Sequence, residues 1–208
     1  MGMIGKGFAA VAGCLLALSA LAAPAMAGTQ KPAFAREYAE TLPPIGFVEF
    51  CQRNPDACQP AEGKQRRVSM TEEKWLLVRM VNAFVNGAIA PITDETLYGT
   101  PEYWTLPADA GDCEDLVLLK KKILQQKGIP AEALRITVVL DEHGEGHAVL
   151  SLTTTRGDVI LDNRRNEIRS WNATGYTMLK RQSAQDPRKW VSLEPARSHS
   201  AVDGTASK

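Results

Sequence analysis

Gly111-Asp112-Cys113-Glu114-Asp115, followed directly by Leu116-Val117-Leu118-Leu119, is the most informative stretch of this 208-residue chain. An acidic N-cap ahead of an apolar run, with Gly128-Ile129-Pro130 as its end, predicts a helix over residues 112–127. The unpaired backbone N–H groups at a helix start lower the pKa of a thiol, which here favours a reactive Cys113. Three neighbouring carboxylates oppose the thiolate, so we expect a compensating histidinium, a metal ion or both.

The first 27 residues have the features of a secretory signal peptide. One charged side chain, Lys6, precedes an apolar run from Phe8 to Ala23, and Ala25-Met26-Ala27 matches the small-x-small cleavage pattern. A membrane anchor is the alternative, although the run is short for a spanning helix. Cleavage predicts a periplasmic or secreted protein of about 180 residues, which is enough for one domain with a core.

The remaining chain divides into three predicted segments. Residues 28–42 are expected to be a flexible lead-in, 43–194 the folded domain, and 195–208 a disordered tail. Basic and acidic residues both number 24, so the composition indicates no nucleic-acid partner and no attraction to an anionic membrane.

The cysteine count predicts one disulfide and one free thiol, because three of the four cysteines follow the predicted cleavage point. Cys51 and Cys58 would be about 10 Å apart in a continuous helix, which is too far for a disulfide. The Asn54-Pro55 break allows the chain to fold back, so we expect a Cys51–Cys58 bridge, with two free thiols as the alternative. An unpaired Cys113 in an oxidising compartment then needs a functional explanation.

Helices are predicted before Gly128 and strands after it. Ser69 and Glu72 resemble a capping box that opens a helix continuing through Val85. Asn82 and Asn86 lie on or near its apolar face, where they either brace another segment or remain exposed. Strands are predicted over residues 134–140, 147–152, 159–162, 176–181 and 190–193.

Cysteine-dependent acyl transfer needs a histidine beside the thiol and a third group that orients the imidazole. Of the three histidines, His147 is the best fixed, because it begins an apolar strand. His143 lies in a glycine-rich turn, and His199 lies in the tail. Asp162 ends the next strand and is the candidate orienting group.

The hairpin between these two strands has two candidate registers. A loop centred on Thr154-Thr155 would set His147 opposite Asp162, whereas a tight turn at Arg156-Gly157 would set Ser151 there. The sequence leaves both open, and the wider loop is the one expected to form a site.

Two metal hypotheses follow from the polar residues. His143 and His147 have a His-x3-His spacing, but the two glycines between them argue against the helix that zinc proteases need. Asp112, Glu114 and Asp115 offer hard oxygen ligands within one helical turn, as calcium requires. Plain capping of the helix by acidic residues is the alternative.

Tyr103-Trp104, the Gly111–Asp115 stretch, Gly146-His147-Ala148-Val149-Leu150 and Leu161-Asp162-Asn163 together resemble the pattern of the bacterial transglutaminase-like cysteine proteinases. The resemblance extends over residues 43–193. It implies an α+β fold of the papain-like and transglutaminase-like type, with helices packed on an antiparallel sheet. It also implies a catalytic triad of Cys113, His147 and Asp162.

The best understood members of that family are periplasmic, calcium-dependent proteases. They cleave the N-terminal region of a large surface adhesin and are controlled by an inner-membrane receptor that responds to a cyclic dinucleotide. The resemblance therefore implies calcium as cofactor, bound by Asp112, Glu114 and Asp115. The implied partners are a protein substrate such as a surface adhesin, and a regulatory receptor. The Cys51/Cys58 pair and the proline-rich lead-in depart from that pattern.

The resulting hypothesis is an exported cysteine endopeptidase. Cys113 attacks a peptide carbonyl as thiolate, His147 serves as base and then acid, and Asp162 fixes the imidazole tautomer. The backbone N–H of Cys113, with the Trp104 region, is the candidate oxyanion hole, and Trp104 is a candidate wall of the substrate cleft. A transglutaminase or amidase with the same triad is one alternative, and a binding module that has lost catalysis is another.

Overall fold

The computed structural model describes residues 1–2, 33–63 and 66–195 of the chain. The predicted signal peptide beyond its first two residues, the first residues of the lead-in and nearly all of the predicted tail lie outside these residues. Among the helices of the described residues, none is long and apolar enough to cross a membrane.

An antiparallel sheet of seven strands, in the order β1-β9-β8-β4-β5-β6-β7, forms the centre of the fold. Five strands match predicted segments: β4 (Leu134–Leu140), β5 (Gly146–Thr154), β6 (Gly157–Leu161), β8 (Thr177–Gln182) and β9 (Trp190–Ser192). The edge strands β1 (Glu40–Thr41) and β7 (Arg169–Ser170) were not predicted. Two residues are too few to carry a periodic pattern.

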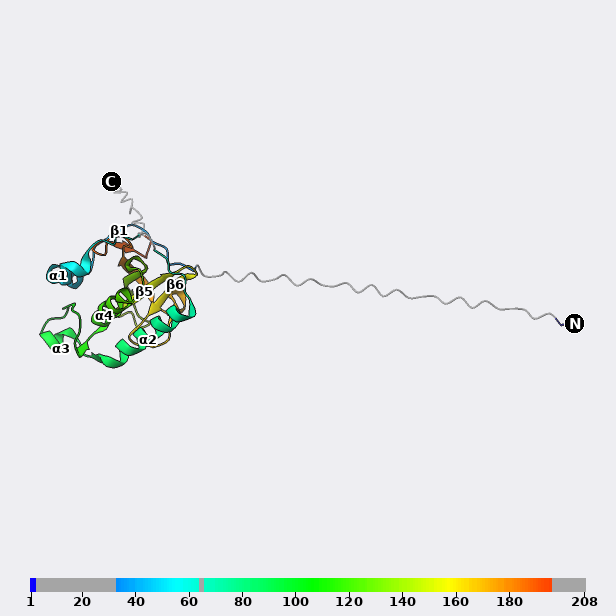
Figure 1. The fold of residues 1–208 in the computed structure, drawn as a ribbon, viewed down its shortest axis with the longest axis horizontal. Helices are drawn as coiled ribbons and strands as arrows, with labels where there is room; N and C mark the ends of the chain where they lie inside the picture. Colours follow the sequence, from blue (N-terminus) through cyan, green and yellow to red (C-terminus); the bar gives the residue numbers. More distant parts are fainter. Residues whose placement is uncertain (3–32, 64–65, 196–208) are drawn as a thin grey trace, which may run out of the picture. The chain divides into compact units, whose positions relative to one another are not determined.

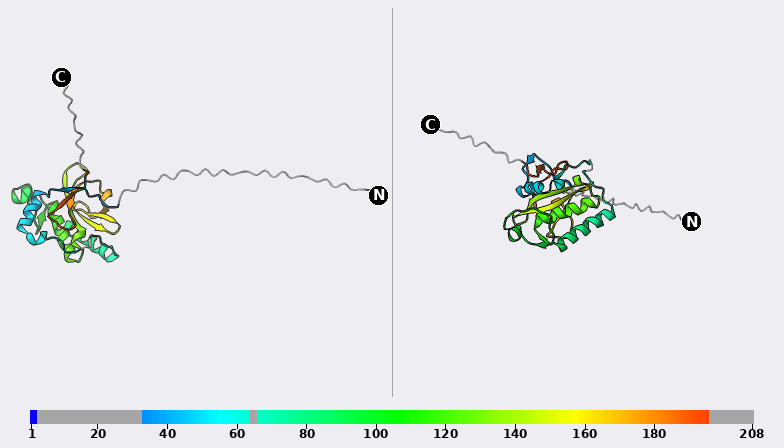
Figure 2. Two further views of the ribbon diagram at one scale, coloured as in Figure 1. Left: turned by 90° about the horizontal axis from the view of Figure 1, so that it is seen from above. Right: turned by 60° about the vertical axis from the view of Figure 1, so that its left-hand side comes forward.

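The helices gather around this sheet, and they are α1 (Ile45–Arg53), α2 (Glu72–Ala88), α3 (Asp94–Tyr98) and α4 (Cys113–Gln126). Helix α4 packs against β4 and β5, and α2 packs against α4 (Figure 1; Figure 2). A parallel pair, β2 (Ala90–Pro91) with β3 (Ala110–Gly111), brings the start of α3 close to the start of α4. Short 3-10 helices complete the fold: η1 (Pro55–Cys58), η2 (Ala131–Ala133) and η3 (Trp171–Ala173). The predicted α+β class, with helices on an antiparallel sheet, is confirmed.

Both faces of the central strands are covered by apolar side chains. Along β5, Ala148, Leu150 and Leu152 face the main core, which also contains Leu116 and Val117 of α4. The alternate residue Val149 joins a second cluster on the other face, with Val139, Ile160 and Met178. Strands covered on both faces have nearly continuous apolar sequences, which is why β4 and β5 were recognisable.

The β5–β6 hairpin has neither of the two registers considered from the sequence. Leu150 pairs with Leu161, and Thr154 pairs with Gly157, so the turn is Thr155-Arg156. Continued by one residue, this register sets Asp162 opposite Val149. The expected wide loop is therefore wrong. His147 and Asp162 are instead diagonal neighbours on one face, and long side chains at such positions are within reach of each other.

The two principal helices begin differently from the prediction. The N-cap of α2 is Thr71, whose hydroxyl accepts a hydrogen bond from the Lys74 N–H at 3.3 Å, so the capping box at Ser69 is wrong. Helix α4 does follow Asp112, but this carboxylate makes no capping bond. Its Oδ2 accepts instead from the backbone N–H of Asp94 at 3.3 Å. Asp112 thus joins α4 to the α3 segment.

Residues 33–42 of the expected flexible lead-in lie along the sheet. The Tyr38 N–H donates to the Ser192 carbonyl at 2.9 Å, and the segment ends as edge strand β1. The Glu37 carboxylate pairs with both Arg135 and Arg181. This described part of the segment differs from the expectation because its backbone and charged groups find partners on the sheet.

Helix α1 and η1 form a small hairpin closed by a disulfide. Cys51 and Cys58 are bonded, with their Cα atoms 5.6 Å apart, and Cys113 is a free cysteine. Helix α1 ends at Arg53, where the Asn-Pro break turns the chain back. The buried Phe47 of α1 packs edge-on against Trp104, with ring centroids 5.6 Å apart, and so ties this hairpin to the loop before α4.

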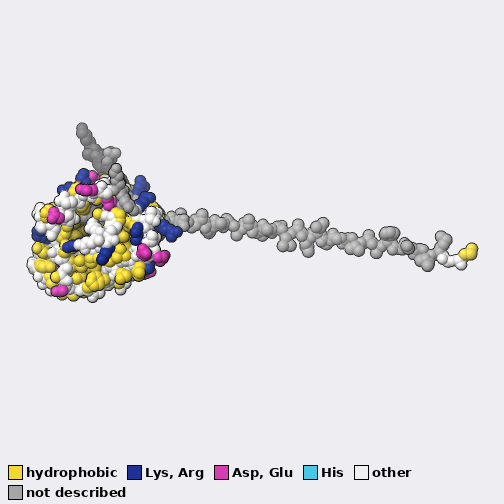
Figure 3. All heavy atoms as spheres, viewed as in Figure 1, with side chains coloured by type: hydrophobic (Ala, Val, Ile, Leu, Met, Phe, Trp, Pro, Cys, Tyr) yellow, Lys and Arg dark blue, Asp and Glu magenta, His cyan; other side chains and the backbone are white. Residues whose placement is uncertain are grey.

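Helix α2 also carries an apolar stripe that faces outward. Leu76, Met80 and Phe84 follow one another at four-residue intervals and are all more than half exposed. Apolar side chains cover much of the molecular face in Figure 3 where Figure 1 places α2 and α3. Contiguous apolar surface of this kind is a feature of sites where proteins meet.

Candidate active site

Cys113 is the first residue of α4 and is separated from the end of β3 only by the N-cap residue Asp112. Its Sγ donates a hydrogen bond to Oε2 of Glu114 at 3.2 Å. Burial raises the pKa of the Cys113 thiol well above its usual value, the negative charge of Glu114 raises it further, and the backbone N–H of Ala148 lowers it. The helix start alone therefore does not make the thiolate, since burial and the carboxylates outweigh it. A positive partner is needed.

His147 and Asp162 form a buried pair. The Nε2 atom of His147 lies 3.0 Å from Oδ1 of Asp162, and their side chains are only 1% and 2% exposed. Burial raises the pKa of Asp162, but hydrogen bonds from His147, Tyr176 and the Arg164 N–H outweigh burial and bring it to about 2. Asp162 is therefore ionised at neutral pH. Its carboxylate contacts Nε2 of His147, so Nδ1 is the ring nitrogen that Asp162 does not engage.

Cys113 and His147 line the same pocket, which has a volume of about 280 Å³. Apolar walls come from Pro44, Trp104 and Val138, and charged groups at the pocket include Glu102 and Lys180. Asp162 lies behind the imidazole and is not part of the lining. Among the described residues, no hydrogen bond joins Cys113 to His147, because the thiol is directed to Glu114. The structure therefore brings Cys113, His147 and Asp162 into one region. The thiol of Cys113 is turned toward the carboxylate of Glu114.

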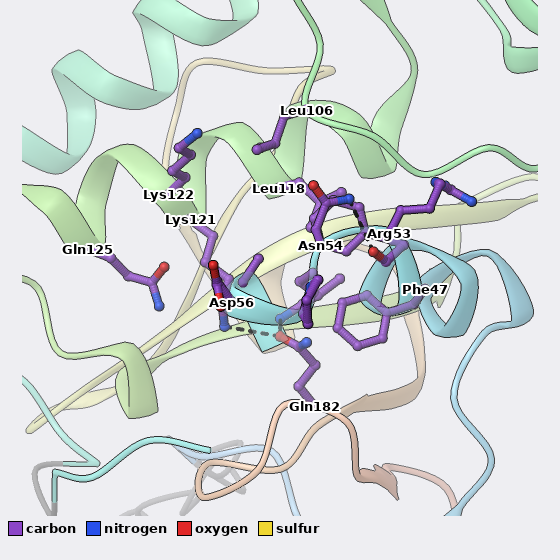
Figure 4. Close-up of a pocket in the computed structure, with 14 residues that line it drawn as sticks. Phe47, Arg53, Asn54, Asp56, Leu106, Leu118, Lys121, Lys122, Gln125 and Gln182 are labelled. Carbon is purple, nitrogen blue, oxygen red and sulfur yellow. Dashed lines mark hydrogen bonds between the residues drawn. The ribbon is translucent and has the colours of Figure 1, made fainter. Parts of the chain in front are cut away.

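A larger cavity lies elsewhere, between α1, η1, α4 and β8, and has a volume of about 450 Å³ (Figure 4). Lys121 and Gln182 are joined there by a hydrogen bond of 3.1 Å, with Phe47 on the opposite wall. None of the three predicted catalytic residues lines it. We place the candidate site at the smaller pocket, because a thiol and an imidazole meet there.

Trp104 is held from three sides. Its indole Nε1 donates to Glu102 at 2.8 Å, and its carbonyl accepts from Arg53 at 2.9 Å. A Cβ on Gly46 would stand 2.8 Å from Nε1, so glycine is needed at that position of α1. The wall that Trp104 gives to the pocket therefore depends on the disulfide-closed hairpin.

Several residues around Asp162 were not predicted from the sequence to belong to this site. The Tyr176 hydroxyl donates to Oδ2 of Asp162 at 2.6 Å, and the Arg164 N–H donates to Oδ1 at 3.1 Å. The side chain of Asn86 donates to the Asp162 carbonyl at 2.9 Å, and Asn82 donates to the carbonyls of residues 165 and 166. Of the two alternatives for these amides, bracing of another segment is the one observed.

Three carboxylates converge beside Cys113. Asp94, Asp112 and Glu114 each offer an oxygen, and these atoms lie within 4.8 Å of one another. Asp115 is not part of this group, since its Oδ1 accepts from the Thr105 N–H at 2.7 Å. The cluster thus contains two of the three predicted calcium ligands and adds Asp94. That residue was missed because it precedes Asp112 by 18 positions.

The cluster has the properties of a site for a hard cation. The buried Oδ1 atoms of Asp94 and Asp112 have no hydrogen-bond partner. Burial, followed by the Asp112 carboxylate, raises the pKa of Glu114 to about 9. Gathering acidic groups out of water without a counter-charge is costly, and an all-oxygen set of this kind suits calcium. The residues present therefore fit a calcium ion.

Comparisons with known proteins place the chain in a family and identify structures with a similar fold. The model of the bacterial transglutaminase-like cysteine proteinase family matches residues 37–198. No curated protein matches the chain significantly. Among solved structures, the calcium-bound form of Legionella pneumophila LapG is 21% identical, with 76% of this chain and 84% of that chain covered, at a TM-score of 0.51. Another LapG structure from the same organism is 23% identical over 71% of this chain and 76% of that chain, at a TM-score of 0.49.

The calcium-bound LapG match shows that the two chains share a fold, and the family match covers most of the chain described here. The chain belongs to the bacterial transglutaminase-like cysteine proteinases, a family of cysteine peptidases.

Proposed function

We propose that this protein is an exported cysteine endopeptidase whose catalytic triad is Cys113, His147 and Asp162. The observation that carries the proposal is the 3.0 Å contact between Nε2 of His147 and Oδ1 of Asp162. It leaves Nδ1 as the ring nitrogen that can exchange a proton with Cys113, which lines the same pocket. A carboxylate that fixes the imidazole in this way is the orienting group of a triad.

The proposed reaction follows from these positions. The Nδ1 atom of His147 takes the thiol proton, and Cys113 attacks the peptide carbonyl. The backbone N–H of Cys113 stabilises the oxyanion, and the imidazolium then protonates the leaving amine. Water, deprotonated by the same imidazole, hydrolyses the acyl-enzyme and restores the thiol. Trp104 forms one wall of the substrate pocket.

We further propose that Asp94, Asp112 and Glu114 bind calcium. The support is their convergence, the buried oxygens without partners and the existence of a calcium-bound LapG with this fold. Bound there, calcium supplies positive charge beside the nucleophile. Glu114 is the acceptor of the Cys113 hydrogen bond, so its commitment as a ligand leaves the thiol available to His147.

The proposed substrate is a protein in the periplasm or on the cell surface. The family resemblance supports a large adhesin as that substrate and an inner-membrane receptor as regulator. The signal-peptide features of the first 27 residues support export.

The test uses the chain from Gly28 onward with native surface proteins of the producing cell. New protein N-termini are mapped by mass spectrometry after incubation with wild type, Cys113→Ala, His147→Ala or His143→Ala. The matched control is His143, which lies in the turn before β5 and outside the pocket. Cleavage by wild type and His143→Ala alone, with circular dichroism unchanged in all four proteins, supports the proposal.

The same experiment separates the alternatives. Full cleavage by Cys113→Ala would refute the triad. Uncut proteins with the mass change of deamidation or cross-linking indicate an amidase or transglutaminase. If nothing reacts, and a thiol probe labels Cys113 no faster than in the denatured chain, the protein is a binding module.

A further inference from the structure

Tyr176 makes the shortest hydrogen bond to the Asp162 carboxylate. Its hydroxyl donates to Oδ2 at 2.6 Å, whereas His147 and the Arg164 N–H use Oδ1 at 3.0 and 3.1 Å. The Nε atom of Arg165 lies farther from Oδ2, at 3.4 Å. Tyr176 is therefore the main restraint on that half of the carboxylate.

The same tyrosine also touches the histidine. The rings of His147 and Tyr176 are nearly perpendicular, with an interplanar angle of 81° and centroids 5.7 Å apart. Edge-to-face contact of this kind is the preferred arrangement of neighbouring aromatic rings. One residue thus restrains both members of the buried pair, the carboxylate through its hydroxyl and the imidazole through its ring.

Arg165 holds the tyrosine in turn. Its guanidinium lies 5.5 Å from the centre of the Tyr176 ring, and Nη2 donates to the hydroxyl oxygen at 3.3 Å. The other contact of Nη2 is Oε1 of Glu142, at 3.2 Å, in the turn that leads to His147. Tyr176 and Arg165 are partly exposed, whereas the Asp162 and His147 side chains beneath them are almost fully buried.

From this geometry we infer that Tyr176 is a positioning residue for the reaction, which keeps the Asp162 carboxylate aligned with Nε2 of His147 and shields their hydrogen bond from water. The inference rests on the proposed triad. The torsion that turns a carboxylate is soft and roughly two-fold, so a carboxylate without a fixed partner on Oδ2 swings away from the imidazole. Hydrogen bonds to a charged group inside a buried site are the strong ones.

The hydroxyl stays a donor throughout the working pH range of a neutral protease. Burial, together with the bonded Asp162 carboxylate, raises the pKa of Tyr176 to about 12. Tyr176 therefore does not transfer protons in the reaction. Its effect is expected in the rate of the chemical step and not in substrate binding, because it is not part of the pocket lining.

The test compares Tyr176→Phe, Tyr176→Ala and the matched control Tyr38→Phe, whose ring lies on the N-terminal segment. For Tyr176→Phe we expect kcat to fall about tenfold with KM unchanged, as for the loss of one hydrogen bond to a charged group. For Tyr176→Ala we expect a fall of about a hundredfold, because the shielding ring is lost as well. Tyr38→Phe should match wild type, and thermal melting reports the fold of each variant.

The second readout does not depend on catalysis. In a Cys113→Ala background, proton NMR should show a downfield resonance from the His147 Nε2–H bonded to Asp162. Tyr176→Phe should move or broaden this resonance, and Tyr38→Phe should leave it in place. Loss of activity with an unmoved resonance, or unchanged kcat in Tyr176→Phe, overturns the inference. Cleavage by Cys113→Ala itself would instead refute the triad, while the resonance still reports on Tyr176.

Discussion

The imidazole of His147 reaches the carboxylate of Asp162 across a diagonal of the β5–β6 hairpin. Their Nε2 and Oδ1 atoms are 3.0 Å apart, although the strand register sets Val149 opposite Asp162. A two-residue turn and the burial of apolar side chains on both faces of the strands hold this register, and a slip by one residue would put the His147 and Asp162 side chains on opposite faces of the sheet. The pair is thus positioned by regular structure and needs no flexible loop.

The carboxylate charge of this pair should be essential for the reaction. We expect Asp162→Asn to lower kcat/KM about a thousandfold or more. A neutral amide does not stabilise the imidazolium of His147 by charge, and it can favour the tautomer with the proton on the wrong ring nitrogen. The measurement is the rate of cleavage of a peptide that spans a mapped site. Asp186→Asn is the control, since Asp186 is partly exposed, pairs with Arg188 and is not part of the pocket lining. Equal rates for the two variants would contradict the role given to Asp162.

Asp162 should also set part of the acid stability. Its pKa is about 2 in the folded protein against 3.8 for the ordinary side chain. A lowered pKa stabilises the fold at pH values above that of the unfolded group, and this contribution disappears as the pH falls from about 4 to about 2. The shift corresponds to about 2 kcal/mol.

The measurement for that prediction is urea denaturation of wild type and Asp162→Asn from pH 6 to pH 2. Wild type should lose about 2 kcal/mol more of its free energy of unfolding than the variant over the acid part of this range. Asp141 also has a lowered pKa, from its hydrogen bond with Arg164, and contributes equally to both proteins. Parallel curves for the two proteins would show that Asp162 is not bound in the folded state as described.

The sequence was most informative where a chemically reactive residue lies on a helix or strand with a regular apolar pattern. Cys113 at a helix start and His147 on an apolar strand could be recognised because each belongs to a regular pattern. Asp94 and Tyr176 could not, since only tertiary packing brings them to the motif. The net pKa shift of Cys113 could not be predicted for a related reason: burial and the Glu114 charge outweigh the helix start, and neither burial nor side-chain direction is visible in the chain.

Calcium should stabilise the protein through the Asp94 cluster. At a hundred times its dissociation constant, a ligand adds about 2.7 kcal/mol to stability, which for a domain of this size raises Tm by about 5 to 10 °C. We expect this rise with calcium, its reversal by EGTA, and a much smaller effect of magnesium, which demands a tighter octahedral site. Differential scanning calorimetry measures it.

Asp94→Asn should abolish most of that rise, because it removes a charge from the oxygen set without changing its shape. The matched control is Asp109→Asn, which changes an exposed residue of the same loop region and should keep the full rise. A full rise in Asp94→Asn would place calcium elsewhere. If only Asp115→Asn abolished the calcium-dependent rise in Tm, the ligands would be those predicted from the sequence, Asp112, Glu114 and Asp115.

Two helical glycines should respond to the same substitution with opposite signs. A Cβ at Gly87 of α2 would meet nothing within 4 Å, so Gly87→Ala should stabilise the protein by about 0.5 to 1 kcal/mol through helix propensity. A Cβ at Gly46 of α1 would crowd the indole of Trp104, which is 3% exposed and bonded to Glu102 and Arg53. Overpacking of this kind costs about 1 to 3 kcal/mol and exceeds the gain in propensity.

Gly46→Ala should therefore lower Tm by about 2 to 6 °C, while Gly87→Ala raises it by about 1 to 3 °C. Gly46→Ala should also raise KM in the cleavage assay, because Trp104 walls the pocket that contains Cys113 and His147. Calorimetry and initial rates on the same preparations check both effects. A stabilised Gly46→Ala variant with unchanged KM would mean that the indole has room to move, and that α1 does not hold the wall of the site.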